Sequence, residues 1–248
     1  MSSIVVYPPF GRGAWSIAGV GGTLDAKGLK KGPYYRAPAV GQVEMPGLRA
    51  ALALRNNRSV DVNDLAVFYA VKVLQQEVGA VDDGILGPRS ESAIKKWQSA
   101  NRLVPDGIPG PKTFRAMLES DVRSAARKID SKIEQMLVGH VGHESGWDPG
   151  AVGYTTPHDL GLCQISGVWH PSLNEEFRLT PSKSIPWAAE FVAENLDYMK
   201  GDVDAGILAY NLGRGGATQW VKAGRPQWFY KVDTYAYIAS VKKWMGPT

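Results

Sequence analysis

One turn sequence occurs twice in this chain, and it constrains the fold more than any other feature. Residues 82–89 read DDGILGPR and residues 105–112 read PDGIPGPK, each directly before a run with helical periodicity. In such a turn the Asp side chain accepts hydrogen bonds from nearby amides, the glycines permit positive φ, and Pro opens the next helix. We expect the isoleucine to anchor the turn in the core. The repeat therefore predicts three helices separated by two nearly identical turns.

The apolar spacing marks the three helices. Residues 64–79 place apolar side chains at three- and four-residue steps and end at a glycine, residues 90–100 carry two apolar side chains on one face, and KTFRAML opens the third helix. Taken alone, this describes a stable turn used twice in a small helical bundle. With Leu74-Gln75 and Trp97-Gln98 late in the first two helices, residues 62–119 resemble the three-helix peptidoglycan-binding domain. The resemblance implies binding to cell-wall glycan or stem peptide.

The composition narrows the class of protein. Of 248 residues, 44% are hydrophobic and 21% are charged, which is typical of a globular chain. No apolar run reaches the roughly 18 to 20 residues that span a bilayer, and no basic segment is interleaved with aromatic residues. We therefore expect neither membrane insertion nor nucleic-acid binding, and we expect a monomer. The net charge of +4 favours an anionic partner such as a cell wall.

The first 61 residues have a different character. Residues 1–61 are rich in Gly and Pro and have little periodicity, so we expect an arm or linker of unknown role with a short strand at residues 4–7. The opening lacks a basic segment followed by an apolar one, which argues against a secretory signal. A single cysteine, Cys163, excludes an internal disulfide and fits synthesis in a reducing cytosol.

A carboxylate ends an apolar helical row in the second half of the chain. Glu144 extends by one turn a row made of Ile129, Ile133, Met136, Leu137, His140 and Val141. Gly146 and Pro149 then end the long helix and leave Glu144 at its edge. A half-buried carboxyl group loses part of its hydration, which favours the protonated form that a general acid needs. Alternatively, Glu144 is the first solvated residue after the core.

Three sequence blocks that follow in order favour the catalytic alternative. HESGWDPGAVG, DLGLCQIS and ILAYNLGRGGATQW resemble the E-S, G-L-M-Q-I and A-Y-N-x-G blocks of soluble lytic transglycosylases and goose-type lysozymes, over residues 125–245. The resemblance implies that Glu144 is the catalytic acid. It also implies a set of substrate-binding residues: Ser145, Gln164, Tyr210, Asn211 and Tyr237. Tyr237 lies in VDTYAYIASV, which resembles the family's late E-T-x-x-Y-V block with Asp-Thr in place of Glu-Thr.

The chain departs from the family pattern at three places. Asp148 stands where Asn is frequent, Cys163 replaces the usual Met, and the loop YTTPHDL replaces a short Gly-Ala segment. We expect Cys163 to narrow one wall of the cleft. The sugar preference at that edge stays open.

The resemblance implies cleavage of a β-1,4 glycosidic bond without a cofactor. Most glycosidases use two carboxylates, one of which protonates the leaving oxygen. A lone glutamate can act first as acid and then as base if the sugar's N-acetyl or 6-hydroxyl group replaces the second carboxylate. Attack by the 6-hydroxyl gives a 1,6-anhydro product, and attack by water gives hydrolysis. Asp159 is the candidate second carboxylate, with a loop-stabilising role as the alternative.

Other residues allow competing interpretations. HESGW lacks the second histidine of the zinc motif H-E-x-x-H, so we expect no metal. His140 is predicted to pack in the core, and Cys163 to be buried and structural rather than nucleophilic. Trp147, Trp169 and Trp228 either stack on sugar rings or pack against protein.

Together these features predict a modular, mainly α protein. An N-terminal arm of residues 1–61 precedes a small three-helix peptidoglycan-binding domain, residues 62–119, and an α+β lysozyme-like transglycosylase domain, residues 120–248. The expected partner is bacterial peptidoglycan, and the expected reaction is cleavage of its MurNAc–GlcNAc bond. We expect a bacteriophage lysin, made in the host cytoplasm and either released by a holin or carried on the virion. The alternative is a non-catalytic wall-binding or virion structural protein that keeps the lysozyme-like fold.

Overall fold

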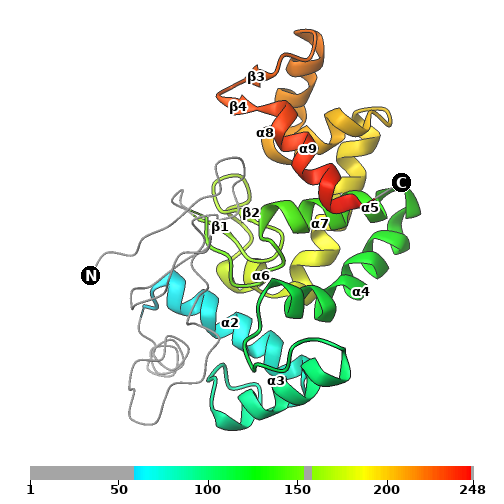
Figure 1. Ribbon diagram of the computed structural model, residues 1–248. Coiled ribbons are helices and arrows are strands. Elements are labelled where there is room, and N and C mark those ends of the chain that lie inside the picture. The colour runs from blue at the N-terminus through cyan, green and yellow to red at the C-terminus, as the bar shows by residue number, and fades with distance from the viewer. Residues whose placement is uncertain (1–58, 154–157, 247–248) are drawn as a thin grey trace. The chain divides into compact units, whose positions relative to one another are not determined.

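The computed structural model describes residues 59–153 and 158–246. Residues 1–58, with the predicted strand, and the first four residues of the YTTPHDL loop lie outside these ranges. The described chain forms two compact units: residues 59–118 with 145–184, and residues 119–144 with 185–246. Helices dominate both units (Figure 1). No helix in the described ranges is long and apolar enough to cross a membrane.

The first unit opens with the three helices that the repeat predicts. Helix α2 (Val62–Glu77) is capped by Asp61, whose carboxylate accepts a hydrogen bond from Asn63 N at 2.9 Å. Helices α3 (Pro88–Ala100) and α4 (Pro111–Ile129) each begin at the proline of a repeated turn. Proline is suited to this position because its fixed φ matches the helix and its missing N–H would have no helical partner.

A buried glutamine at the end of α2 organises the first turn. Gln75 Nε2 lies 2.8 Å from Asp83 Oδ1, 3.0 Å from Ile85 O and 3.1 Å from Ser90 Oγ. Its Oε1 accepts a hydrogen bond from Gly84 N at 2.9 Å. One side chain thus satisfies polar groups from both sides of the turn.

Gln98 repeats this arrangement at the second turn. Its Nε2 lies 3.1 Å from Asp106 Oδ1, 3.2 Å from Ile108 O and 3.2 Å from Thr113 Oγ1. Its Oε1 accepts from Gly107 N at 2.9 Å. The copied sequence therefore forms copied hydrogen bonds, and the two glutamines are part of the repeat.

The glycines and isoleucines of the turns match the predictions only in part. The first glycine of each copy has positive φ as predicted, 72° and 74°, but Gly87 has an extended φ of −107° and caps α3. Ile85 is half-buried, not a core anchor, because its amide donates to the exposed Asp83 carboxylate and stays at the rim. The buried residue is the next one along the chain, Leu86 or Pro109.

Residues 145–184 complete the first unit. Strand β1 (Asp159–Leu160) pairs antiparallel with β2 (Ile165–Ser166), and α6 (Glu175–Leu179) and the start of α7 (Pro181–Tyr198) follow. Helix α2 packs against α6, and one core cluster joins both segments: Leu65, Ala66, Val152, Leu160 and Leu179. Removing the first helices would therefore uncover apolar surface on residues 145–184.

The second unit contains the end of α4, residues 119–129, and several elements that follow it. These are the 3-10 turn η2 (Ser131–Ile133), α5 (Glu134–Glu144), the rest of α7, α8 (Val203–Lys222) and α9 (Thr234–Met245). Strands β3 (Trp228–Phe229) and β4 (Val232–Asp233) form an antiparallel hairpin directly before α9.

The single long helix predicted before Glu144 is wrong. Helix α4 ends at Ile129, and Asp130 accepts a hydrogen bond from Lys132 N at 2.8 Å. The 3-10 turn η2 follows, and α5 begins only at Glu134. An Asp side chain that bonds to the following backbone competes with helix continuation. Ile129 is 43% exposed and does not belong to the apolar row. The rest of the row is buried as predicted: Ile133, Met136, Leu137, His140 and Val141.

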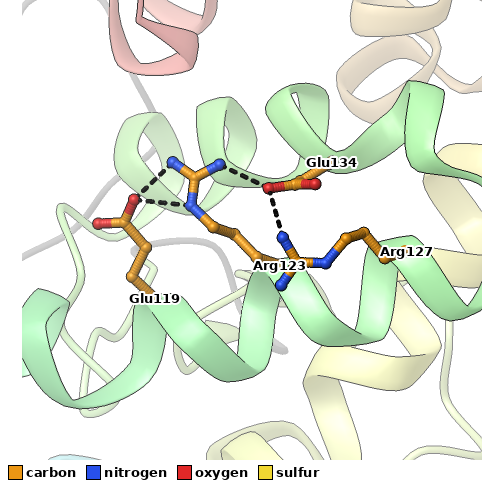
Figure 2. A network of polar contacts seen from close by, with 4 residues as sticks. All are labelled: Glu119, Arg123, Arg127 and Glu134. Carbon is orange, nitrogen blue, oxygen red and sulfur yellow. Dashed lines mark hydrogen bonds and ion pairs between the residues drawn. The ribbon is translucent and has the colours of Figure 1, made fainter.

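Charged side chains join the start of α5 to α4. Arg123 Nη2 donates to Glu119 Oε1 at 2.6 Å, and Arg123 Nη1 donates to Glu134 Oε1 at 2.9 Å (Figure 2). Arg127 Nη1 donates to the same Glu134 oxygen at 3.1 Å. The hydrogen bond from Arg123 holds the pKa of Glu134 below its usual range. Since Glu134 is the first residue of α5, this network anchors the helix that ends at Glu144.

Two glycines of α5 allow α9 to approach closely. A Cβ at Gly139 would lie 2.8 Å from Val241 O, and a Cβ at Gly142 would lie 2.4 Å from the Trp244 ring. Both distances are shorter than any ordinary Cβ contact, so a larger residue requires the helices to move apart. This close approach, which places α9 along α5 (Figure 1), positions the side chains described next.

Candidate active site

Glu144 and Tyr237 meet where α5 packs on α9. Glu144 is the last residue of α5 and is only 4% exposed, so it is buried rather than half-buried as the sequence suggested. Tyr237, also buried, donates a hydrogen bond from its hydroxyl to Glu144 Oε1 at 2.7 Å. Two residues that the family resemblance assigned to one site, far apart in the chain, are therefore in direct contact.

His143 contacts the same tyrosine from α5. Its ring meets the Tyr237 ring edge to face, with centroids 4.5 Å apart and planes at 76°. Its Nδ1 forms a 2.7 Å hydrogen bond with Ser240 Oγ. Ser240 lies about one turn beyond Tyr237 on α9. Its Nε2 is buried and has no hydrogen-bond partner within the described part of the chain.

His140, one turn earlier on α5, contacts the tyrosine of the AYN block. Its ring stacks on Tyr210 of α8 with centroids 4.3 Å apart and planes at 22°. Phe191 of α7 packs against Tyr210 in a T-shaped geometry, with centroids 5.5 Å apart. The prediction that His140 is a packed core residue is confirmed.

Both histidines are neutral at neutral pH. Burial lowers the pKa of His140 to about 3, with the neighbouring His143 adding to the shift, and burial lowers the pKa of His143 to about 4. Two uncharged imidazoles therefore lie within about one turn of Glu144 on the same helix.

Asn211 follows Tyr210 immediately before a bend in α8. Gly213 has φ 70° and ψ 165°, outside the helical region, so the helix is kinked there. The Oδ1 atom of Asn211 is buried and has no hydrogen-bond partner among the described residues. A buried acceptor of this kind is costly unless water or a ligand donates to it.

Ser145 begins the turn that follows Glu144 and belongs to the first unit. Its Oγ accepts a hydrogen bond from Trp147 N at 3.1 Å, and Asp148 Oδ1 accepts one from Gly150 N at 2.8 Å. Gly146 has φ 61°, which ends the helical conformation as predicted. The hydroxyl of Ser145 thus already stabilises the local backbone.

Gln164 lies in the loop between β1 and β2 of the first unit. Its φ of 47° is unusual for a residue with a side chain. Its Nε2 donates to Ala151 O at 3.1 Å and to Gly161 O at 3.0 Å. Its Oε1 is buried and, in the ranges the structure describes, accepts no hydrogen bond. Strained backbone and an unsatisfied acceptor are both features of ligand-binding positions.

Asp159 lies on β1 in the first unit beside a buried arginine. Arg178 Nη1 donates to His158 O at 2.6 Å and to Ile165 O at 3.4 Å, and Arg178 interacts electrostatically with Asp159. Burial lowers the pKa of Arg178, while Glu175 and Asp159 oppose this shift. The interaction with Arg178 supports the loop-stabilising alternative for Asp159. Asp159 Oδ1 is buried and has no hydrogen-bond partner among the described residues, so the second-carboxylate alternative stays open.

The tryptophans and the cysteine occupy different environments. Trp147 is fully buried, with the Arg115 guanidinium 5.5 Å from its ring centroid, so it packs against protein. Trp169 and Trp228 are 77% and 63% exposed and can meet an external ligand. Cys163 is buried, as predicted.

A cavity of about 360 Å³ lies along α8 and α9 and contains none of the predicted site residues. Its lining comprises Asp204, Trp220, Arg225, Tyr235, Ile238, Ala239 and Lys242. Arg225 is ion-paired with Asp202, and Lys242 with Asp204. Among the described residues, no group of three or more His, Cys, Asp or Glu side chains is placed to hold a metal ion.

Sequence reasoning missed the contacts of His143 and Ser240. In the sequence, His143 stands out only as the first residue of the incomplete metal motif HESGW, and Ser240 belongs to none of the motifs described above. A usable signal was present in VGHVGHE, which repeats Gly-His at a spacing of three directly before the glutamate. On a helix this spacing places the two glycines on one face and the two histidines beside them.

Family models match two consecutive segments of the chain. Residues 62–117 match a putative peptidoglycan binding domain, and residues 122–231 match the transglycosylase SLT domain. No curated protein and no solved structure matches the chain significantly. The predicted order of a peptidoglycan-binding domain followed by a transglycosylase domain is confirmed, as is the mainly α, lysozyme-like fold class.

This combination of fold and domains defines an enzyme that binds and cleaves peptidoglycan. The SLT domain at residues 122–231 indicates a lytic transglycosylase, a glycosidase that acts on peptidoglycan. Its partner is peptidoglycan, and it acts on the cell wall.

Proposed function

We propose that the chain cleaves the β-1,4 bond between MurNAc and GlcNAc with Glu144 as general acid and then general base. The observation that carries this proposal is the 2.7 Å hydrogen bond from Tyr237 to the buried Glu144 Oε1. With Oε1 engaged as an acceptor, the acid proton is directed to the other oxygen, and the carboxyl group has a fixed orientation. Such a group is suited to protonating the bridging oxygen of a bound glycan.

The reaction needs only one carboxyl group if the sugar supplies a nucleophile. Glu144 protonates the leaving oxygen as the glycosidic bond breaks, and the resulting carboxylate then removes a proton from the attacking hydroxyl. If the 6-hydroxyl attacks, the product carries a 1,6-anhydro ring; if water attacks, it carries a reducing end. Tyr237 stabilises the intermediate carboxylate by donating to it.

The remaining predicted residues are proposed to contact the sugar. The buried acceptors Asn211 Oδ1 and Gln164 Oε1 suit the N–H of an acetamido group or a sugar hydroxyl. Tyr210, held by His140 and Phe191, offers a fixed phenol. Ser145 is proposed as a further contact through the turn after Glu144.

The test compares two Glu→Gln variants at opposite ends of α5. We expect Glu144→Gln to abolish turbidity clearing of purified walls, while Glu134→Gln, which removes the partly exposed ion pairs with Arg123 and Arg127 at the other end of α5, keeps it. Glu144→Gln should still sediment with walls, because binding belongs to the first helices. Clearing by Glu144→Gln at the wild-type rate would remove this residue from the mechanism. If the wild type itself does not clear walls, the non-catalytic alternative gains support.

Two further measurements address the product and the second carboxylate. Mass spectrometry of released muropeptides separates anhydro ends from reducing ends, which differ by one water. Asp159→Asn should lower thermal stability rather than remove activity at a temperature where the variant is folded, since the Asp159 carboxylate interacts electrostatically with the buried Arg178. Loss of turnover in the folded variant would instead support a second carboxylate.

We also propose that the chain serves as a phage lysin in host cell lysis. The pairing of a wall-binding and a wall-cleaving domain in one chain supports this role, because tethering raises the local concentration of the enzyme on its insoluble substrate. Expression in the cytoplasm of a host with and without a holin tests it. Lysis that depends on the holin is expected for an endolysin, and lysis from outside by purified virions is expected for a virion-borne enzyme.

A further inference from the structure

We propose that His143, held by Ser240, is a positioning residue that fixes Tyr237 against Glu144. This inference rests on the proposed role of Glu144. It assigns a purpose to a buried histidine that the reaction itself does not use.

The contacts form a continuous series between α5 and α9. Ser240 Oγ lies 2.7 Å from His143 Nδ1, the His143 ring meets the Tyr237 ring at 4.5 Å and 76°, and Tyr237 donates to Glu144 at 2.7 Å. The first and last bonds hold the two ends of the series, and the ring contact joins them. The orientation of the tyrosine hydroxyl therefore depends on the orientation of the imidazole.

Burying the polar imidazole of His143 costs free energy, which argues that the residue does more than fill space in the core. His143 is buried, and its Nε2 has no hydrogen-bond partner among the described residues. A Phe or Leu would fill this volume without burying an unsatisfied nitrogen. What an imidazole adds is a ring edge for Tyr237 together with a nitrogen that Ser240 can hold in one plane. Local costs of this kind are expected near functional sites, where they are offset by the surrounding structure.

The α9 register supports the same assignment. Tyr237 and Ser240 are three residues apart and so lie on one face of α9, opposite the neighbouring residues Glu144 and His143 of α5. Gly142 allows the helices to come close enough for both contacts. Gly142, His143 and Ser240 thus act together in positioning Tyr237 against the acid, Glu144.

The first experiment separates the ring of His143 from its hydrogen bond. His143→Phe keeps the ring beside Tyr237 but removes the bond to Ser240, and Ser240→Ala removes the same bond from the other side. His143→Asn keeps a hydrogen-bonding group near Ser240 but removes the ring. We expect kcat on soluble glycan fragments to fall about tenfold in the Asn variant, as for one lost hydrogen bond to the acid, with KM unchanged. The Phe variant should restore part of this loss.

The second experiment is a double-mutant cycle with Tyr237→Phe. If His143 acts through Tyr237, His143→Asn should lower kcat in the wild type and have little further effect in the Tyr237→Phe background. A residue that only supports the fold would lower kcat by the same factor in both backgrounds, and that result overturns the inference. Ser184→Ala is the control, because it removes a buried serine hydroxyl that has no partner in the described ranges.

The outcomes distinguish this inference from the proposed function. If Glu144→Gln stays active, the proposed function fails, whatever the cycle shows. If Glu144→Gln is inactive but the His143 and Tyr237 effects multiply independently, only the positioning role fails. Unchanged kcat in both His143→Phe and His143→Asn, measured on folded protein, also overturns it.

Discussion

Replacing Gly142 by Ala tests whether the close contact of α5 with α9 assembles the site. The added Cβ would lie 2.4 Å from the Trp244 ring, where ordinary contacts begin at 3.4 Å, so the ring or the helix must move by about 1 Å. Overpacking of this kind costs about 1–3 kcal/mol. A shift of α9 also displaces Tyr237 from Glu144, and a misplacement of about 1 Å near reacting groups can lower the rate about 100-fold.

The assay for Gly142→Ala combines thermal unfolding with kcat on soluble glycan fragments. A loss of about 2 kcal/mol should lower the unfolding midpoint of a unit of this size by roughly 8–16 °C. Gly215→Ala is the matched control, because it also lies in a helix but a Cβ there meets nothing within 4 Å. It should be neutral or stabilise by about 0.5 kcal/mol. If Gly142→Ala melts and turns over like the wild type, the argument from helix approach is refuted.

Two further predictions concern the buried polar groups. Burial depresses the pKa of His140 to about 3 and of His143 to about 4 from 6.5, so the unfolded chain binds protons first as pH falls. The free energy of unfolding is therefore highest above pH 6.5, where both rings are neutral in the folded and the unfolded chain. It decreases toward pH 4 and below, by roughly 3 kcal/mol or more for each ring. Unfolding midpoints measured from pH 7 to pH 4 should show this decline, and His140→Phe should reduce it; an equally steep decline in that variant would contradict the assignment. In the first turn, Gln75→Leu should cost about 2–3 kcal/mol in chemical unfolding because several polar groups lose their partner, whereas the neighbouring, exposed Gln76→Leu should stay within about 0.5 kcal/mol. Similar losses in both variants would mean that Gln75 does not organise the turn.

The repeated turns were predictable because their interactions are local. Aspartate, glycine and proline act within a few residues of themselves, so their chemistry can be read directly from DGIxGP. The prediction was incomplete where a partner came from the preceding helix. Gln75 and Gln98 were recognised as part of the pattern, but their hydrogen bonds across the turn appear only when the helices pack.

For the catalytic candidates too, local sequence patterns were informative and contacts between distant helices were not. Sequence blocks indicate Glu144 and the tyrosines, whereas the apolar spacing that places Ile129 in the same row is misleading, because Asp130 interrupts the helix directly after it. His143 and Ser240 were missed because nothing in either local sequence indicates the other. Their contact depends on two helices that are distant in the chain.

The amino-acid sequence by itself determined the order of the domains and the positive φ of the first glycine in each turn, and it singled out Glu144 as the candidate acid, because residue type and short spacing express these directly. Only the tertiary structure decided that Tyr237 donates to Glu144, that two histidines are buried beside the tyrosines, and that residues 145–184 share a core with α2. These features depend on how closely helices approach, which is set by packing between segments that are far apart along the chain.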